Sequence, residues 1–245
     1  LSCLYSHLFQ RAPGVFVNYV DAIAISSARI ANLLTAENRR MKVPSCPEWT
    51  LLDLVIHVGQ VQEFWSHNIR EANADTRWSG EITMPETDGE ASIWLRNQTE
   101  SLVDAIGHSS ENSPCWTWWE EPRTAKAVAR HQVQEAEVHR WDAELTIGRP
   151  NPLPLEIAID GLTEYLFVHR FAIEDLRLPH IQFDATDTDG NWHINAIGNP
   201  AVTASGTASD LALFLNGRLL AESLTIKGEA EGLQRFELAI PKINS

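Results

Sequence analysis

Cysteine is scarce in this sequence. Its 245 residues include only Cys3, Cys46 and Cys115, and no two of these form a Cys-x-x-Cys pair. Such scattered cysteines do not indicate a disulfide framework, a thiolate metal site or thioredoxin-type redox chemistry. We therefore expect a protein of a reducing compartment, the cytoplasm.

Long apolar runs and basic clusters are also missing. No apolar run approaches the roughly 18 residues that span a bilayer, and the N-terminal stretch lacks the basic start and apolar segment of a signal peptide. With 19 Lys and Arg against 33 Asp and Glu, the net charge is -14, and no basic patch interleaved with aromatic residues offsets it. These absences argue against anionic membranes and nucleic acids as partners. We expect a monomer that acts on small molecules.

What is present is an ordinary globular composition, with 44% hydrophobic and 21% charged residues. The first part of the chain has apolar residues at helical spacing in several segments, separated by polar stretches or by stretches that contain Pro and Gly. The predicted helices cover residues 15–37, 51–71, 90–106 and 129–145. A bundle of these helices would bury their apolar stripes, so we predict that residues 12–150 form a four-helix bundle.

The pattern changes after Asn151-Pro152-Leu153-Pro154. A helix is predicted over residues 155–171 and another over 208–216, with Ser209 as its N-cap. Short alternating segments predict strands at 180–185, 192–197, 201–205 and 223–226. The predicted fold class is therefore α+β, with an N-terminal four-helix bundle followed by a smaller α+β domain over residues 152–245.

The second predicted helix carries a polar group on its apolar face. Its start is marked by Thr50 and Asp53, which have the spacing of a capping box. Residues 43–50, before this helix, contain two prolines and read as a rigid connector. His57 falls within the apolar arc of the helix, next to Leu54. A hydrogen-bonded core histidine is the simplest interpretation, and a metal ligand is the alternative.

The fourth predicted helix carries several ionisable groups on its apolar stripe. Three- and four-residue intervals place them on one face: His131, Glu135, His139 and Asp142. Burying such groups is costly unless they are paired or bound to a metal. Glu135 and His139, joined by His57 from the neighbouring helix, make the two-histidine, one-carboxylate ligand set of an open zinc site.

Other assignments of these residues stay open. A solvated ion pair is the metal-free interpretation of the Glu-x-x-x-His spacing. His131 and Glu137 are rival ligands, although Glu137 points to another face of the helix. Asp142 is placed to accept the second imidazole N–H of a ligating histidine, or to form a salt bridge with Arg140.

Two stretches together resemble the signatures of the mycothiol-dependent maleylpyruvate isomerase family. They are VPSCPEWTLLDLVIHVG and RHQVQEAEVHRWDAELTIGRP, and the later DATDTDGNW and GTASDLALFLNGR are similar to the family's C-terminal domain. The resemblance implies a DinB-like four-helix bundle that holds a divalent metal, usually zinc, followed by a small α+β domain. It places the metal ligands on His57, Glu135 and His139, and the family's functional C-terminal arginine on Arg218. A surface arginine that follows a helix is the alternative interpretation of Arg218. Gln134 stands where many relatives carry histidine, a change that affects the pocket rather than the ligand set.

The resemblance also implies a metal-dependent enzyme that uses a low-molecular-weight thiol such as mycothiol. A thiol at the open position of the metal loses its proton, because coordination favours the thiolate. The thiolate adds to an activated double bond, permits rotation and leaves again, which isomerises an enoyl-keto acid such as maleylpyruvate. Arg218 is expected to neutralise the substrate's carboxylates. The same site can instead transfer the thiol to an electrophile, as an S-transferase does.

Two other functional classes compete with this hypothesis. One is a zinc hydrolase, in which the metal lowers the pKa of bound water. The other is a non-catalytic metal-binding module.

Three further features carry structural expectations. Trp116, Trp118 and Trp119 can form an apolar wall beside the metal, but we favour a loop that packs onto the bundle. Cys46, in a turn between Ser and Pro, is expected to be a packed structural thiol, and a catalytic nucleophile is the alternative. Gly59 is expected to permit a close approach of a neighbouring helix.

Overall fold

The computed structural model describes residues 14–244. Cys3 and residues 12 and 13, where the predicted helical domain begins, lie outside this range. Contacts between Cα atoms divide the chain into two compact units. One unit covers residues 18–151, and the other contains residues 152–244 together with 14–17. The combination of helices and sheet confirms the predicted α+β class.

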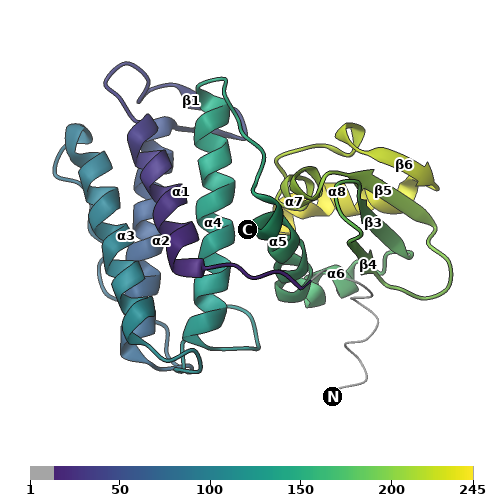
Figure 1. Ribbon diagram of the computed structural model, residues 1–245, viewed down its shortest axis with the longest axis horizontal. Helices are drawn as coiled ribbons and strands as arrows, with labels where there is room; N and C mark the ends of the chain where they lie inside the picture. Colours follow the sequence, from purple (N-terminus) through teal and green to yellow (C-terminus); the bar gives the residue numbers. More distant parts are fainter. Residues whose placement is uncertain (1–13, 245) are drawn as a thin grey trace. The chain divides into compact units, whose positions relative to one another are not determined.

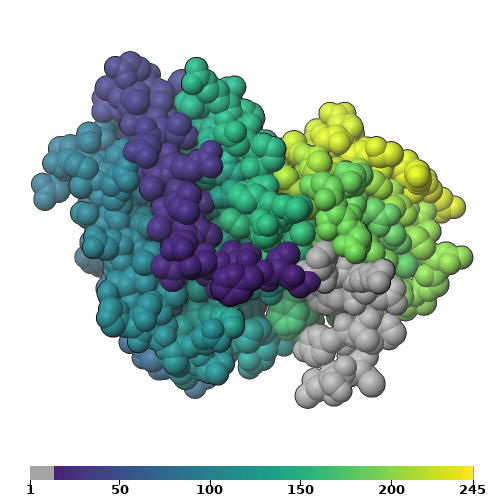
Figure 2. All heavy atoms as spheres, viewed as in Figure 1, coloured from purple at the N-terminus to yellow at the C-terminus, as the bar shows by residue number. Residues whose placement is uncertain are grey.

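Four long α-helices build the first unit within the described residues (Figure 1). They are α1 (Tyr19–Leu33), α2 (Leu51–Glu71), α3 (Ala91–His108) and α4 (Ala125–Thr146). Both α1 and α2 pack mainly against α3 and α4, so α1 and α2 occupy opposite corners of the bundle. In the space-filling view, the side chains of α1 lie between those of α3 and α4 on one face (Figure 2). The predicted four-helix bundle is therefore confirmed.

Helix α1 is shorter than the predicted 15–37 at both ends. Its N-cap is Asn18, whose side chain accepts a hydrogen bond from the Asp21 backbone N–H. Leu34 has an extended backbone, and the Asn38 side-chain amide donates to the Leu33 carbonyl at 2.6 Å. A side-chain donor thus takes over one of the carbonyls that a helix end leaves unpaired.

The connector before α2 contains strands that the sequence did not predict. Strand β1 (Lys42–Val43) pairs antiparallel with β2 (Cys46–Thr50). The capping box of Thr50 and Asp53 is confirmed, and α2 begins at Leu51 as predicted. Because the cap fixes the first helical residue, it also fixes the direction in which each side chain of α2 points.

Helix α2 approaches α3 closely at Gly59, as expected. A Cβ atom at this position would lie 2.1 Å from the Trp94 ring. Toward the N-terminal end of α2 from this contact, the two helices share a fully buried apolar core with α1, α4 and β1. Its members include Ile30, Val43, Leu51, Leu54, Val55, Leu95 and Ala143. This packing supports the ends of α2 and α4 that carry the ionisable residues.

A mixed four-stranded sheet forms the centre of the second unit (Figure 1). Its strands are β3 (Ile181–Ala185), β4 (Asn191–Ile194), β5 (Val202–Gly206) and β6 (Thr225–Gly228), in the order β4-β3-β5-β6. The β3–β4 and β5–β6 pairs are antiparallel, and β3–β5 is parallel. The helices are α5 (Leu155–Val168), α6 (Arg170–Asp175), α7 (Ala208–Leu215) and α8 (Glu231–Ile243), with 3-10 turns η2 (Asp88–Glu90) in the first unit and η3 (Ala221–Ser223) in this one.

The aromatic core of this unit joins elements that are far apart in the sequence. Phe183 of β3, Phe214 of α7 and Phe236 of α8 have ring centroids 6.2 to 6.3 Å apart. Helix α8 was not predicted, and Phe236 is its main contribution to the core. The predicted cap of α7 was wrong: Thr207 is the N-cap, while Ser209 Oγ accepts the Leu153 backbone N–H at 2.9 Å.

No helix among residues 14–244 has the length and apolar character needed to cross a membrane.

Candidate metal centre

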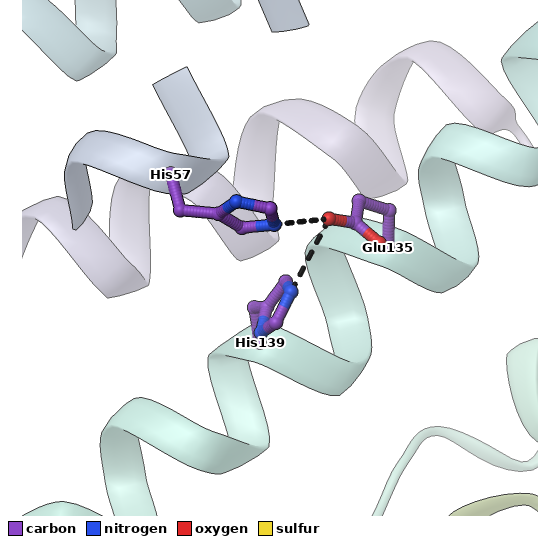
Figure 3. A group of neighbouring side chains, drawn as sticks. All are labelled: His57, Glu135 and His139. Atoms are coloured by element: carbon purple, nitrogen blue, oxygen red, sulfur yellow. Dashed lines mark hydrogen bonds and ion pairs between the residues drawn. The ribbon is translucent and has the colours of Figure 1, made fainter. Parts of the chain in front are cut away.

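Three side chains from two neighbouring helices converge in the first unit. His57 extends from α2, and Glu135 and His139 extend from successive turns of α4 (Figure 3). Glu135 Oε1 lies 3.1 Å from His57 Nε2 and 3.2 Å from His139 Nε2. One nitrogen or oxygen of each residue lies within 4.8 Å of the other two. Among the described residues, no other three His, Cys, Asp or Glu side chains meet this spacing.

These distances suit a small cation. Zinc binds nitrogen and oxygen ligands at about 2.0–2.2 Å, so the donor atoms of a tetrahedral site lie roughly 3.3 Å from one another. Two imidazoles and one carboxylate supply three ligands, which leaves a fourth position for another molecule. The side chains of His57 and Glu135 are 32% and 25% exposed, whereas that of His139 is 6% exposed. The fourth position can therefore be reached from the side of His57 and Glu135.

The electrostatics of the cluster also favour a cation. Burial by itself raises the pKa of Glu135, but the charge of His139 and hydrogen bonds from both histidines outweigh it and hold that pKa well below its usual range. Burial lowers the pKa of His139, but the Glu135 charge and the hydrogen bonds to Asp142 and Glu135 raise it to about 9. A metal ion and a proton therefore compete for His139.

Asp142 lies directly behind His139. Its Oδ2 is 2.8 Å from His139 Nδ1, and its Oδ1 accepts a hydrogen bond from Ser45 Oγ at 2.5 Å. The Asp142 side chain is fully buried. Since Nδ1 donates to this carboxylate, Nε2 is the nitrogen left to face Glu135 and His57.

An indole packs against both imidazoles. The ring centroid of Trp49, in β2, lies 4.5 Å from that of His57 and 6.0 Å from that of His139. The sequence analysis missed this residue, although it lies in one of the stretches that carry the family resemblance. The β1–β2 hairpin thus provides the site with both an aromatic cover and Ser45.

A cavity of about 530 Å³ opens beside His57 and Glu135. Its walls are mostly aromatic and apolar and come from α2, α4 and the loops before α3 and α4; they include Val61, Phe64, Trp65, Ile82, Trp116 and Trp118. Arg77 also lines the cavity, with its guanidinium carbon 5.0 Å from the Phe64 ring and 5.7 Å from the Trp116 ring. The cavity thus places an apolar surface and the Arg77 guanidinium beside the candidate metal centre.

The tryptophans of residues 116–119 divide between two roles. Trp119 is 4% exposed and packs against the bundle, which agrees with the favoured interpretation of a packing loop. Trp116 and Trp118, however, line the cavity, so that interpretation was incomplete. The ring of His131 contacts Trp65, Trp118 and Trp119, and His131 lies in the cavity wall rather than in the metal cluster.

Glu137, a rival ligand in the sequence analysis, belongs to a different network. Arg140 Nη2 donates to Glu137 Oε1 at 2.7 Å and Arg140 Nη1 donates to Glu144 Oε2 at 2.5 Å. Ser26 also donates to Glu137, and Arg29 donates to Glu144. Arg140 and Glu137 are buried, so this network joins α1 to α4 inside the bundle. Its carboxylates are already occupied by cationic and hydroxyl donors.

Two other residues singled out from the sequence lie elsewhere. Arg218 belongs to the second unit, just after α7, and its Nη1 donates to the Asn216 carbonyl at 2.7 Å; its catalytic role stays a prediction. Cys46 is partly buried and packs against the core of the bundle, as expected of a structural thiol. Burial raises the pKa of Cys115 to about 12, so this thiol remains protonated at neutral pH.

Gln132 and Arg77 are site residues that the sequence analysis missed. Gln132 lies three residues before Glu135 and therefore shares its face of α4, a signal that was present in the sequence. Arg77 lies between the predicted helices 51–71 and 90–106 and had no such signal. The Trp78 ring stacks on His67 at 4.2 Å, and the Trp78 backbone N–H donates to Asn68 Oδ1 at 2.9 Å; these contacts hold the loop beside the cavity.

Comparison with known proteins points to one family. Residues 20–144 match the family model described as the mycothiol maleylpyruvate isomerase N-terminal domain. A crystal structure of the mycothiol-dependent maleylpyruvate isomerase is similar with a TM-score of 0.62 and 15% identity, covering 87% of this chain and 94% of that one. A crystal structure of a histidine-to-alanine mutant of that enzyme gives a TM-score of 0.63 and 15% identity over 87% and 92%. At this identity the likeness shows the fold. No curated protein sequence matches the chain.

Proposed function

Because this chain belongs to the mycothiol maleylpyruvate isomerase N-terminal domain family, we propose that it is a metal-dependent enzyme that uses a low-molecular-weight thiol. Its reaction is either the isomerisation of an activated double bond or the transfer of the thiol to an electrophile. The observation that carries this proposal is the convergence of three donor atoms, within 4.8 Å of one another, at the edge of an apolar cavity.

The residues present fit a divalent metal, in the first place zinc. His57, Glu135 and His139 offer two nitrogens and one oxygen at separations suited to tetrahedral coordination. Two neutral imidazoles and one carboxylate leave a net positive charge on the centre. When bound, the metal supplies a Lewis acid that keeps a thiol deprotonated, and the thiolate is the nucleophile for reversible addition to an electrophile.

The chain's own residues prepare the site for this chemistry. Asp142 accepts a hydrogen bond from the Nδ1–H of His139, which leaves Nε2 directed toward the metal position. Trp49 packs on both imidazoles and restricts their rotation. The aromatic walls of the cavity exclude water from the electrophile, which limits its hydrolysis. We assign to Arg218 the neutralisation of substrate carboxylates.

The proposal is tested by metal analysis and by thiol-dependent turnover. We expect freshly purified protein to contain about one equivalent of zinc, because the cluster holds one three-ligand site. With mycothiol, it should convert maleylpyruvate to its trans isomer or attach the thiol to an electrophile such as a haloarene. Activity without thiol on an ester or amide would instead support a zinc hydrolase, and metal without any turnover would support a binding module.

The variant His57→Ala separates catalysis from stability. The His57 side chain is partly exposed, so its removal should leave the bundle folded while metal content and turnover are lost. A metal with a purely structural role would give a different result, with a lower unfolding temperature accompanying the metal loss. His108→Ala, on the exposed end of α3, is the matched control and should retain both metal and activity.

A further inference from the structure

Gln132 is a buried polar residue whose side chain has no hydrogen-bond partner among residues 14–244. It is 1% exposed, and neither its side-chain nitrogen nor its side-chain oxygen has a partner within the described part of the chain. A buried amide normally satisfies both groups, because leaving either one unpaired destabilises the fold. A molecule bound in the neighbouring cavity can supply both partners.

Gln62 shows what the same bundle does with a structural glutamine. It is also 1% exposed, but its Nε2 donates to Ser27 Oγ at 2.7 Å and its Oε1 accepts from Thr99 Oγ1 at 2.7 Å. The helices around Gln62 thus carry hydroxyl groups at the required positions. Gln132 has no such neighbours, although it belongs to the same bundle.

The position of Gln132 indicates where its partner comes from. It lines the cavity together with His57 and Glu135, one helical turn before Glu135 on α4. The cavity walls also include the rings of Phe64, Trp65 and Trp116. A flat molecule that stacks on these rings can bring a polar edge to Gln132 while another part lies beside the metal ligands.

We propose that Gln132 is a specificity-determining residue of this cavity, and that the preferred ligand is a planar aromatic or conjugated molecule with a carboxamide-type edge. Such an edge has a C=O beside an N–H, so it accepts from the Gln132 amide nitrogen and donates to its amide oxygen. A carboxylate does not satisfy this edge, because it offers only acceptors and would face the Gln132 oxygen with a second negative atom. The proposal rests on the proposed function only in taking the cavity as the place of the electrophile, and it favours an electrophile other than maleylpyruvate, whose two ends are carboxylates.

A binding comparison without thiol or turnover tests the inference separately from the proposed function. Benzamide and acetophenone have nearly the same shape, and they differ in an NH2 or a CH3 group beside the carbonyl. Ligand-observed NMR titrations of the metal-loaded protein measure both affinities. We expect benzamide to bind about tenfold more tightly, because acetophenone leaves the Gln132 oxygen unpaired.

The variant Gln132→Met removes the amide at similar volume and should bring the two affinities to within about twofold. It should also raise the unfolding temperature of the ligand-free protein, because no buried polar group is left unpaired. Gln98→Met is the matched control: Gln98 lies on α3 outside the lining of this cavity, and its Nε2 donates to Thr83 Oγ1 at 3.3 Å. This control should keep the preference for benzamide.

Three results would overturn the inference. They are equal affinities in the unaltered protein, no binding of benzamide up to its solubility limit, or an unchanged preference in Gln132→Met. Each of these results stands whether or not the protein turns over maleylpyruvate with a thiol. Conversely, if the protein prefers benzamide but shows no thiol-dependent turnover, the role of Gln132 in binding is supported and the proposed enzymatic function is not.

Discussion

Asp142 is the residue that holds His139 in place. The carboxylate is fully buried between His139 Nδ1 and Ser45 Oγ. We expect Asp142→Asn to keep the fold, since the amide has the same shape, and to lower zinc affinity about 10- to 100-fold, as is usual for the hydrogen-bond partner of a ligating histidine. Competition with a chromophoric chelator measures this change.

The matched control is Asp104→Asn. Asp104 also faces a histidine, with its Oδ1 3.0 Å from His108 Nδ1, but on the exposed surface of α3. Zinc affinity should be unchanged in this variant. If Asp142→Asn also retains the original affinity, Asp142 has no part in orienting the metal ligand.

How far the site follows from the sequence differs from residue to residue. Glu135 and His139 lie one turn apart on a single helix, so their proximity follows from helical geometry alone. His57 could be added only by assuming that α2 lies next to α4. Arg77 and the roles of Trp116 and Trp118 depend on how loops fold over the bundle, and loop side chains have no periodic signal.

At the scale of the helix, Gly59 sets the distance between α2 and α3. Any side chain at this position meets the Trp94 ring. We expect Gly59→Ala to reduce the free energy of unfolding by about 1–3 kcal/mol, the usual cost of overpacking a core contact. Urea denaturation, followed by far-UV circular dichroism, measures the change.

Gly107 is the control for this substitution. It lies in the last turns of α3, and a Cβ there would have no neighbour within 4 Å. Gly107→Ala should leave stability unchanged or raise it by up to about 1 kcal/mol, because alanine favours the helix. Equal effects of the two substitutions would mean that helix propensity, rather than contact with Trp94, governs position 59.

The elements that the sequence predicted best are helices whose first residue is marked by a local capping motif. The Thr50–Asp53 capping box gave the start of α2 without reference to the rest of the fold. Helix α8 was missed because Gly232 and Pro241 interrupt its pattern, and its stability comes from packing Phe236 into the core. The β1–β2 pair was missed because two-proline segments normally argue against strands.

At the scale of the whole molecule, the two units have separate cores and different titrating groups. In the second unit, His180 Nε2 and His193 Nδ1 are 2.9 Å apart and both residues are buried. Burial lowers the pKa of His193, the charge of His180 lowers it further, and Asp184 opposes this in part. His193 therefore binds a proton less readily in the folded unit than in the unfolded chain.

This difference makes the second unit sensitive to acid. As the pH falls below about 6.5, the ordinary histidine pKa, His193 binds a proton in the unfolded chain before it does so in the folded unit. The stability of the folded unit is therefore greatest above this pH and decreases as the pH falls. Calorimetry from pH 8 down to pH 5 should show a falling transition temperature for the second unit. His193→Gln should flatten the dependence, whereas the exposed His108→Gln should leave it as it is. A steep dependence that persists in His193→Gln would assign it to other groups.

Three indoles in the cavity wall give the protein an intrinsic optical reporter. Trp65, Trp116 and Trp118 line the space beside His57 and Glu135, so a molecule that enters it changes the surroundings of these chromophores. Emission from these residues should respond to occupancy without any attached dye. Collections of small molecules can thus be screened for cavity ligands on the unmodified protein.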